Sequence, residues 1–457
     1  MGTGLCDQPG GHRPGHHPLS GVATLPGAGA HLWRREGLTR EVSFGAESVG
    51  RSGTRFPYEN HPHSQRDKET TVITEIPRSE FQDRIKRVQE ELAKRHLDAL
   101  LAFGSEAEPQ YVRYLSDHWP AFETAAVLIP VEGEPMLLIG PESLTFAQSR
   151  SKIDKIRQIL EFRESAEPEY PGAQLDTFTS VLDEVSGGRG VKRLALVGYP
   201  IIVAPVYEGI RAAMAGGELV RADDIINSLR KVKSENELAL MREAFRISEK
   251  AIEAILNQIK PGMTETQVVG IAQGTMYSLG AEYEGHPLYV LSGRNSANAI
   301  GRPTSRKLVE GEIIQLNIGA RVGGYSSSVG RPIVLGRITD EQRKFLQMGL
   351  DASARTMEVM RAGVPARDVA VAVQEFITRR GYGDCILYGP CHGIGLMECE
   401  PPWIETNSDY VLVENYTFQV DCFLYTKSYG ARWEDGVRVT RDGVEQLSSY
   451  RREIIVV

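Results

Sequence analysis

A pair of long helices followed by several strands occurs twice in the second half of the chain, and this repetition restricts the possible fold more than any other feature. The first helix begins at Ser234, which can form a capping box with Glu237, and the next begins at Thr264, which can form one with Gln267. The second copy comprises two helical segments, residues 339–363 and 366–381, and two strands, residues 416–426 and 430–440. We therefore predict an internally duplicated α+β domain over residues 227–457, with a site between its two halves.

Residues 73–226 show a different pattern, in which strand-like segments, including a hairpin around Glu132-Gly133, alternate with helical ones. This alternation predicts a smaller α/β domain. It contains neither a phosphate-binding glycine motif nor a nucleophile elbow, so we expect it to contribute oligomer contacts or one wall of a pocket. Residues 1–72 are rich in Gly, Pro, Arg and His without apolar periodicity, and we expect them to form a disordered extension.

The composition excludes several classes of partner. The 457 residues carry a formal net charge of −8, with acidic and basic residues interspersed, so nucleic acid is not an expected partner. No run of eighteen apolar residues occurs and the N-terminal residues lack a signal-peptide pattern, so we expect no membrane association and a cytoplasmic location. The five cysteines are irregularly spaced, which predicts reduced thiols. A small-molecule substrate is the expected partner.

Residues 316–332, LNIGARVGGYSSSVGRP, are typical of a β-hairpin. The glycine pair Gly323-Gly324 lies between two short apolar runs, where it favours a tight turn. A hairpin that presents ligands to a hard cation needs acidic side chains, but this one has none and carries three serines in its second strand. The hairpin therefore has the layout of a metal-binding element but lacks the negatively charged side chains that such an element needs.

Four motifs in the second half carry a resemblance to a known family. They are SGRNSANAIGRPTSRKLVEGEII, LNIGARVGGYSSSVGRP, GPCHGIGLMECEPP and RWEDGVRVTRDGVEQLS. From about Ser79 to the C-terminus, the chain resembles the creatinase, aminopeptidase P and prolidase family of Xaa-Pro peptidases. The resemblance implies a duplicated pita-bread C-terminal domain preceded by a creatinase N-terminal-like domain. It also implies a hydrolase-like enzyme and a homodimer that pairs through the smaller domain.

In the metallopeptidases of this family, five side chains hold a pair of divalent metals. The matching positions here are Asn317, Ser328, His392, Asp421 and Glu434. Two aspartates are thus replaced by neutral side chains, and one glutamate is shortened to an aspartate, so we expect no pair of metals. Either no metal is bound, or a single divalent metal is held by His392, Asp421 and Glu434.

Three other family positions also differ. Ile300 replaces the histidine that follows the SGxNSAxP motif, and Cys399 replaces the second histidine of HGxGxxxHExP. Gly330 occupies the position of the substrate-binding glutamate of creatinase. The resemblance therefore does not predict creatine hydrolysis.

The remaining polar residues make up the predicted site. We expect His392, Glu434 and Asp421 to be catalytic, with His392 transferring a proton and an acid holding a cationic group. The expected substrate-binding residues are His286, Asn317, Tyr325, Ser328, Cys399 and Arg432. Arg432 and Glu434 alternate on one strand and so share a face, where they can also form an ion pair.

Several of these residues have a second interpretation. Cys399 is either a nucleophile activated by a neighbouring base or an inert buried thiol. Tyr325 either donates a hydrogen bond into the pocket or fills space beside the hairpin. His286 either replaces the lost histidine or lies at the surface. His392 alone could be a core residue, but its place in the family motif favours the active site.

Three functions follow as hypotheses. The first is a metal-independent, creatinase-like enzyme that acts on a C–N bond of a small nitrogenous or amino-acid-derived substrate. The second is a single-metal Xaa-Pro aminopeptidase or dipeptidase. The third is a ligand-binding protein without catalysis. With the hairpin acids lost, we expect Xaa-Pro hydrolysis to be negligible.

Overall fold

The computed structural model describes residues 75–457, which form one compact unit. The expectation of a disordered extension at residues 1–72 falls outside this part of the chain. No helix within residues 75–457 is long and apolar enough to cross a membrane.

The N-terminal part is built around a six-stranded mixed sheet with the strand order β4-β3-β2-β1-β5-β6. Its strands are β1 Ala99–Gly104, β2 Ala125–Pro130, β3 Met136–Ile139, β4 Ile156–Gln158, β5 Arg193–Val197 and β6 Glu218–Arg221. Its helices are α1 Arg78–Lys94, α2 Gln110–Ser116, α3 Leu144–Arg150, α4 Phe178–Ser186, α5 Ala204–Ala213 and α6 Asp223–Lys231. The predicted alternation of helices and strands is therefore confirmed, while the predicted boundary at residue 226 lies inside α6 and stays a prediction.

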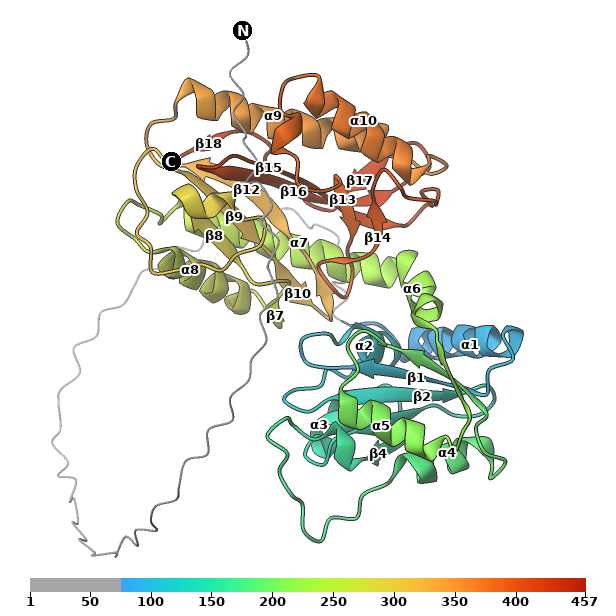
Figure 1. Cartoon of the computed structure of the whole chain (residues 1–457). Coiled ribbons are helices and arrows are strands. Elements are labelled where there is room, and N and C mark those ends of the chain that lie inside the picture. The colour runs from blue at the N-terminus through green and yellow to red at the C-terminus, as the bar shows by residue number, and fades with distance from the viewer. Residues whose placement is uncertain (1–74) are drawn as a thin grey trace, which may run out of the picture. The chain divides into compact units, whose positions relative to one another are not determined.

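The C-terminal part contains two pairs of long helices and a large sheet (Figure 1). The helices are α7 Glu235–Leu256, α8 Glu265–Ser278, α9 Asp340–Val359 and α10 Ala366–Thr378. The large sheet has the order β14-β13-β15-β16-β12-β9-β8, with β17 paired to β16 and β18 to β12, and β11-β10-β7 form a small sheet. The strands are β7 Tyr283–Glu284, β8 Tyr289–Ser292, β9 Ile313–Ile318, β10 Ala320–Val322, β11 Tyr325–Ser326, β12 Val329–Val334, β13 Cys391–Gly393, β14 Glu400–Ile404, β15 Thr417–Tyr425, β16 Gly430–Val439, β17 Val444–Gln446 and β18 Ile455–Val456.

Local signals in the sequence produce these elements as expected. Ser234 caps α7 and Thr264 caps α8, each in a reciprocal capping box with the residue three positions later. The turn between β10 and β11 is made by Gly323 and Gly324, whose φ values of 54° and 91° are positive. A two-residue hairpin loop with positive φ at both positions matches the twist of its strands, and glycine adopts it without steric cost.

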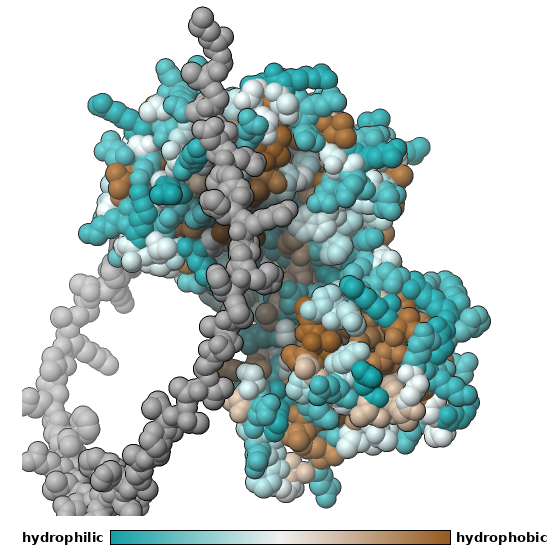
Figure 2. All heavy atoms as spheres, viewed as in Figure 1, coloured by the Kyte–Doolittle hydropathy of each residue, from teal (hydrophilic) through white to brown (hydrophobic). Residues whose placement is uncertain are grey.

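Two helix pairs, α7 with α8 and α9 with α10, pack against the large sheet (Figure 1). Helices α9 and α10 pack on alternate residues of β15 such as Val420 and Leu424, whereas α7 packs on β9 and β12 and α8 packs on α7 and β8. Trp433 of β16 points to α9, where its Nε1 donates a hydrogen bond to the carbonyl of Leu346 at 3.0 Å. The neighbours of Trp433 in β16 therefore point away from α9, to the face that we call the inner face of the sheet. Buried polar groups on this face need hydrogen-bond or ion-pair partners. The visible outer surface is largely hydrophilic, with smaller apolar areas (Figure 2).

Candidate functional site

Strand register brings three residues of the predicted site and Gly330 into one row across the sheet. Asp421 of β15 lies opposite Glu434 of β16, and Glu434 lies opposite Gly330 of β12. Gly330 in turn lies opposite Asn317 of β9. Residues directly opposite each other project from the same face of a sheet, so this row lines one patch of the inner face. His392 belongs to the adjacent row, because it pairs with Gln419.

Gly330 makes the close approach of these strands possible. A Cβ atom at this position would lie 2.7 Å from the Cβ of Glu434 and 3.2 Å from Oδ1 of Asn317. No side chain fits there without displacing Glu434. The glutamate with which creatinase binds its substrate therefore has no counterpart at this position, as the sequence indicated.

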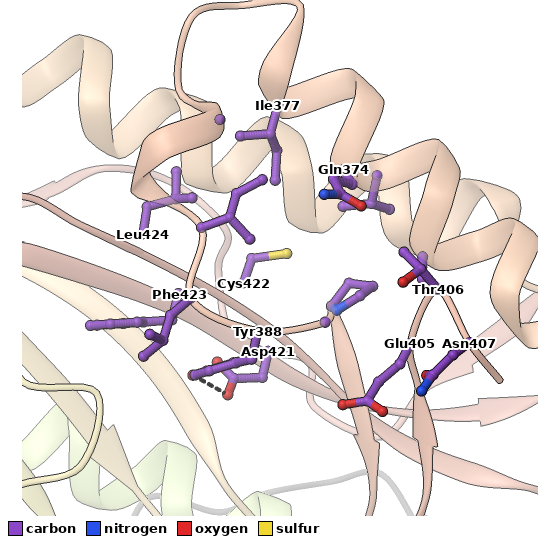
Figure 3. Close-up of a pocket in the computed structure, with 17 residues that line it drawn as sticks. Gln374, Ile377, Tyr388, Glu405, Thr406, Asn407, Asp421, Cys422, Phe423 and Leu424 are labelled. Atoms are coloured by element: carbon purple, nitrogen blue, oxygen red, sulfur yellow. Dashed lines mark hydrogen bonds between the residues drawn. The ribbon is translucent and has the colours of Figure 1, made fainter. Parts of the chain in front are cut away.

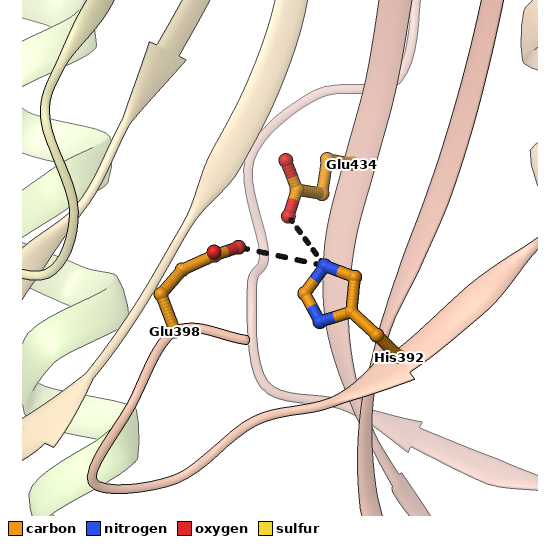
Figure 4. Close-up of side chains that lie close together, drawn as sticks. All are labelled: His392, Glu398 and Glu434. Carbon is orange, nitrogen blue, oxygen red and sulfur yellow. Dashed lines mark ion pairs between the residues drawn. The ribbon is translucent and has the colours of Figure 1, made fainter. Parts of the chain in front are cut away.

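His392, Glu398 and Glu434 form the tightest cluster of possible metal ligands among the described residues (Figure 4). One donor atom from each side chain lies within 4.8 Å of the other two. His392 Nε2 is 3.6 Å from Oε1 of Glu398 and 3.9 Å from Oε1 of Glu434. His392 Nδ1 lies 3.0 Å from the Gly393 carbonyl, which can only accept, so Nδ1 carries a proton and Nε2 faces the two carboxylates.

Burial gives the two carboxylates of this cluster an unusual electrostatic state. It raises the pKa of Glu398 to about 7 and holds the pKa of Glu434 well above its ordinary value, and the nearby Asp421 charge adds to both effects. Neither oxygen of Glu434 has a hydrogen-bond partner within the described residues. A buried carboxylate without partners is costly unless a proton or a cation accompanies it. The cluster is therefore set up to receive positive charge.

Asp421 lies outside this cluster because other groups hold it. Nη1 of Arg432 is 3.3 Å from Oδ2 of Asp421, and the hydroxyl of Tyr388 donates to the same oxygen at 2.7 Å. Arg432 also donates to the carbonyl of Ala299 at 2.6 Å and lies 3.9 Å from Oε2 of Glu434. The tightest group of possible ligands among the described residues therefore contains Glu398 in place of Asp421, and the expected set of His392, Asp421 and Glu434 stays a prediction.

The two positions that lost their acids form hydrogen bonds of their own. Ser328 Oγ lies 3.0 Å from Asn317 Oδ1 and 3.0 Å from Nε2 of His286. Burial lowers the pKa of His286 to about 4, so its ring is neutral at pH 7. These three groups offer dipoles and no negative charge, and a second dication has no charged ligand on this side of the site. His286 is half-buried beside the hairpin, which places it in the predicted site.

Two predicted substrate-binding residues have other surroundings. The hydroxyl of Tyr325 is fully buried, donating to Glu237 at 2.7 Å and accepting from Arg84 at 3.3 Å, so the prediction that Tyr325 reaches into the pocket is wrong. Its large ring and its alternation in β11 direct it to the core. Cys399 is exposed, contrary to the interpretation as a buried thiol. Partial desolvation and the Glu398 charge hold the pKa of Cys399 above its ordinary value, which disfavours a thiolate nucleophile.

Glu398 is the residue that sequence reasoning missed. It lies six positions after His392 in GPCHGIGLMECEPP, immediately before Cys399. The family pattern assigns no role to this position, and so we did not consider it. The usable signal was an acid placed in the loop between two pocket-lining positions. Ile300, which replaces a family histidine, is 87% exposed and contributes no proton-transfer group.

Two cavities border the site. The larger, of about 840 Å³, is lined by His286, Glu398 and Cys399 together with Arg321 and Trp119. The smaller, of about 500 Å³, lies between α10 and the end of β15 and reaches Asp421 and Tyr388 from the sheet edge (Figure 3). Both volumes are in the range of small-molecule sites. Glu398 connects the larger cavity to the ligand cluster.

The possible metal ligands can be tested against the requirements of a metal. Two donor atoms of one zinc-like ion, each about 2.0–2.2 Å from it, are at most about 4.4 Å apart. The distances of His392 to the two glutamates meet this limit, and small side-chain movements would close the remaining separation. One divalent metal therefore fits His392, Glu398 and Glu434.

Comparison with known proteins identifies the family of both parts of the chain. Residues 239–441 match metallopeptidase family M24, and residues 84–232 match the creatinase/prolidase N-terminal domain. The Xaa-Pro dipeptidase of Pyrococcus furiosus is 30% identical over 239 residues, which cover 52% of this chain and 69% of the relative. The Xaa-Pro dipeptidase of Pyrococcus horikoshii is 25% identical over 380 residues, covering 82% and 99%.

The solved structures include an X-Pro aminopeptidase from Thermotoga maritima, with a TM-score of 0.72 and 26% identity, covering 82% of this chain and 99% of that one. The fold predicted from the sequence, a creatinase N-terminal domain followed by a pita-bread domain, is confirmed by this likeness and by both domain matches. The chain therefore belongs to metallopeptidase family M24, the family of creatinase, aminopeptidase P and prolidase, as a hydrolase-like member.

Proposed function

We propose that this protein hydrolyses the Xaa-Pro type C–N bond of a short peptide, with a single divalent metal held by His392, Glu398 and Glu434. The observation that carries the proposal is the convergence of these three donor groups around the free Nε2 of His392. One histidine and two carboxylates form a ligand set that suits a single Mn²⁺, Fe²⁺ or Zn²⁺ ion. The unpartnered oxygens of Glu434 support it, since a cation would satisfy them.

A metal at this position supplies a Lewis acid for the carbonyl of the scissile bond. The protein groups around it orient its ligands. The hydrogen bond from His392 Nδ1 to the Gly393 carbonyl fixes the ring, and the packing of Trp403 at 5.5 Å restricts its rotation. Arg432 neutralises Asp421 and leaves Glu434 free for the cluster. On the opposite wall, neutral His286 is held by Ser328, whose Oγ lies 3.0 Å from its Nε2.

The positive charge of Arg432 limits the site to one metal. Its guanidinium lies 3.3 Å from Asp421 and 3.9 Å from Glu434, where it already supplies one charge to the acids. A second dication would meet this charge and the neutral pair Asn317 and Ser328. The expectation that no metal pair binds is thereby retained as part of the proposal.

The metal-independent, creatinase-like function, which we placed first from the sequence, finds no support in the comparisons. The relatives reported above are named Xaa-Pro dipeptidases and an X-Pro aminopeptidase. Gly330 and exposed Ile300 also lack the groups that creatinase uses. We had expected Xaa-Pro hydrolysis to be negligible because the hairpin acids are lost; with a single metal held by the cluster that contains Glu398, we now expect it to be measurable. The homodimer and the cytoplasmic location stay predictions.

The test is hydrolysis of Gly-Pro and Ala-Pro by protein stripped with EDTA and then supplied with Mn²⁺, Co²⁺ or Zn²⁺. We expect turnover only after metal is added, and loss of turnover in Glu434→Gln and Glu398→Gln. Glu414→Gln, an exposed acid ahead of β15, is the matched control and should keep full activity. Equal turnover in EDTA and in metal, or none with any metal, would overturn the proposal.

A further inference from the structure

Glu400, the first residue of β14, is a buried carboxylate that two cations hold. Nζ of Lys233 lies 3.0 Å from its Oε1, and Nη2 of Arg230 donates to its Oε2. Burial by itself would raise the pKa of Glu400, but the charges of Arg230 and Lys233 outweigh it and hold the pKa below its ordinary value. Glu400 is therefore ionised and already compensated, so it does not compete for a metal although it lies only two positions after Glu398.

The two cations are themselves held in place by packed segments. Arg230 lies in the last turn of α6, and its guanidinium is 5.6 Å from the ring centroid of Tyr111 in α2. Lys233 lies between α6 and α7, where its backbone N–H donates to the carbonyl of Asn415 at 3.0 Å. Both cations are as deeply buried as Glu400. Buried ion pairs are screened far less than exposed ones, so these contacts restrict the position of the Glu400 carboxylate.

Glu400 holds one end of the loop that carries Glu398. This loop, residues 394–399, connects β13 to β14, and Gly393 at its start pairs with Glu400 at its end. Oε2 of Glu400 also accepts a hydrogen bond from the backbone N–H of Met397 at 3.3 Å. The side chain of Glu400 thus contacts the residue that directly precedes Glu398. The position of Glu398 therefore depends on where Glu400 is held.

We propose that Glu400 is a positioning residue, which holds the Glu398 carboxylate against His392. Its ion pairs with Arg230 and Lys233 keep the end of the loop in place. Oε1 of Glu398 is 3.6 Å from Nε2 of His392, whereas two ligands of one zinc-like ion are at most about 4.4 Å apart. A shift of the loop by about 1 Å therefore removes Glu398 from the ligand set. This inference rests on the proposed metal-dependent function and adds a residue that assembles its site.

The first measurement is the Kd of the full chain for Mn²⁺, by calorimetry after EDTA treatment and without turnover. Glu400→Gln keeps the shape of the side chain but leaves both cations without an anion, and we expect its Kd to rise about 10- to 100-fold, as when groups that orient metal ligands are lost. Lys233→Met should raise the Kd in the same direction, and Lys233→Arg should restore most of the affinity. Glu80→Gln is the matched control, because Glu80 of α1 also accepts from three side chains, all outside the loop, and should keep the wild-type Kd.

Hydrogen exchange of the backbone amides of residues 394–399 separates failure of this inference from failure of the proposed function. In the metal-free protein these amides should exchange at least about 10-fold faster in Glu400→Gln and Lys233→Met than in the wild type, but not in Glu80→Gln. Faster exchange of the loop in a protein that binds no Mn²⁺ even as the wild type would reject the metal site and keep the positioning role of Glu400. Wild-type exchange of the loop in Lys233→Met, and in Glu400→Gln where it folds, would overturn the inference.

Discussion

Replacing Glu398 with Gln should stabilise the metal-free protein and weaken the metal-loaded one. Burial raises the pKa of Glu398 from 4.5 to about 7, which corresponds to a cost on the order of 3 kcal/mol in the free energy of unfolding at pH 7. The unfolded chain releases the proton of Glu398 above pH 4.5, whereas the folded protein retains it up to about pH 7. Stability therefore falls as the pH rises through this window, and Glu398→Gln removes the loss.

Urea unfolding followed by tryptophan fluorescence measures this effect. In EDTA at pH 7, Glu398→Gln should be more stable than the wild type by about 2–3 kcal/mol, and the two should converge near pH 4. With Mn²⁺ at 100 times its Kd, the wild type should gain about 2.7 kcal/mol, while the variant gains little. Glu414→Gln should follow the wild type in both conditions. A variant that is less stable than the wild type in EDTA at pH 7 would refute the electrostatic account of the cluster.

Four further predictions address other parts of the structure. Tyr325→Phe should lower the free energy of unfolding by about 1–3 kcal/mol, since Glu237 loses a buried hydrogen bond, yet keep peptidase activity; lost activity at full stability would return Tyr325 to the site. Gly330→Ala should lower the free energy of unfolding by about 1–3 kcal/mol and abolish turnover, because its Cβ would lie 2.7 Å from Cβ of Glu434. Retained turnover, together with a crystal structure in which Glu434 is not displaced, would contradict this. Burial, and then the Arg113 charge, lower the pKa of His118 to about 4. The free energy of unfolding should therefore fall by about 3 kcal/mol as the pH falls from 6.5 to 4. Denaturation at several pH values should show that this loss is absent in His118→Leu. Light scattering at micromolar concentration should report a homodimer, and a monomer would reject the assembly predicted from the family.

Much of the fold followed from local signals in the sequence. The capping boxes at Ser234 and Thr264 and the turn at Gly323-Gly324 depend on residues within a few positions of one another. The repeated helix pairs then identified the duplicated domain. The row from Asp421 to Asn317 depends on strand register, which the family resemblance supplied and periodicity alone could not.

The missing parts of the site depend on packing between distant segments. The cluster at Glu398 requires a loop to return toward β16, and sequence spacing does not encode that approach. The pairing of Asp421 with Arg432 and Tyr388 joins residues from three chain segments, and it removes an acid that the motif assigned to a metal. Tyr325 was predicted to bind substrate because it belongs to the hairpin motif, but its hydroxyl is held by Glu237 and Arg84, which come from distant segments of the chain. All three differences arise from contacts between residues that are far apart in the sequence, so local sequence patterns do not predict them.

The number of metal ions bound per chain tests the central claim most directly. Elemental analysis after loading with Mn²⁺ or Zn²⁺ and exhaustive dialysis should give one ion per chain in the wild type. The value should fall toward zero in Glu398→Gln and in His392→Ala and stay at one in Asp421→Asn, because Asp421 is held by Arg432 outside the cluster. Two ions per chain, none in the wild type, or one in Glu398→Gln with unchanged affinity would contradict the account.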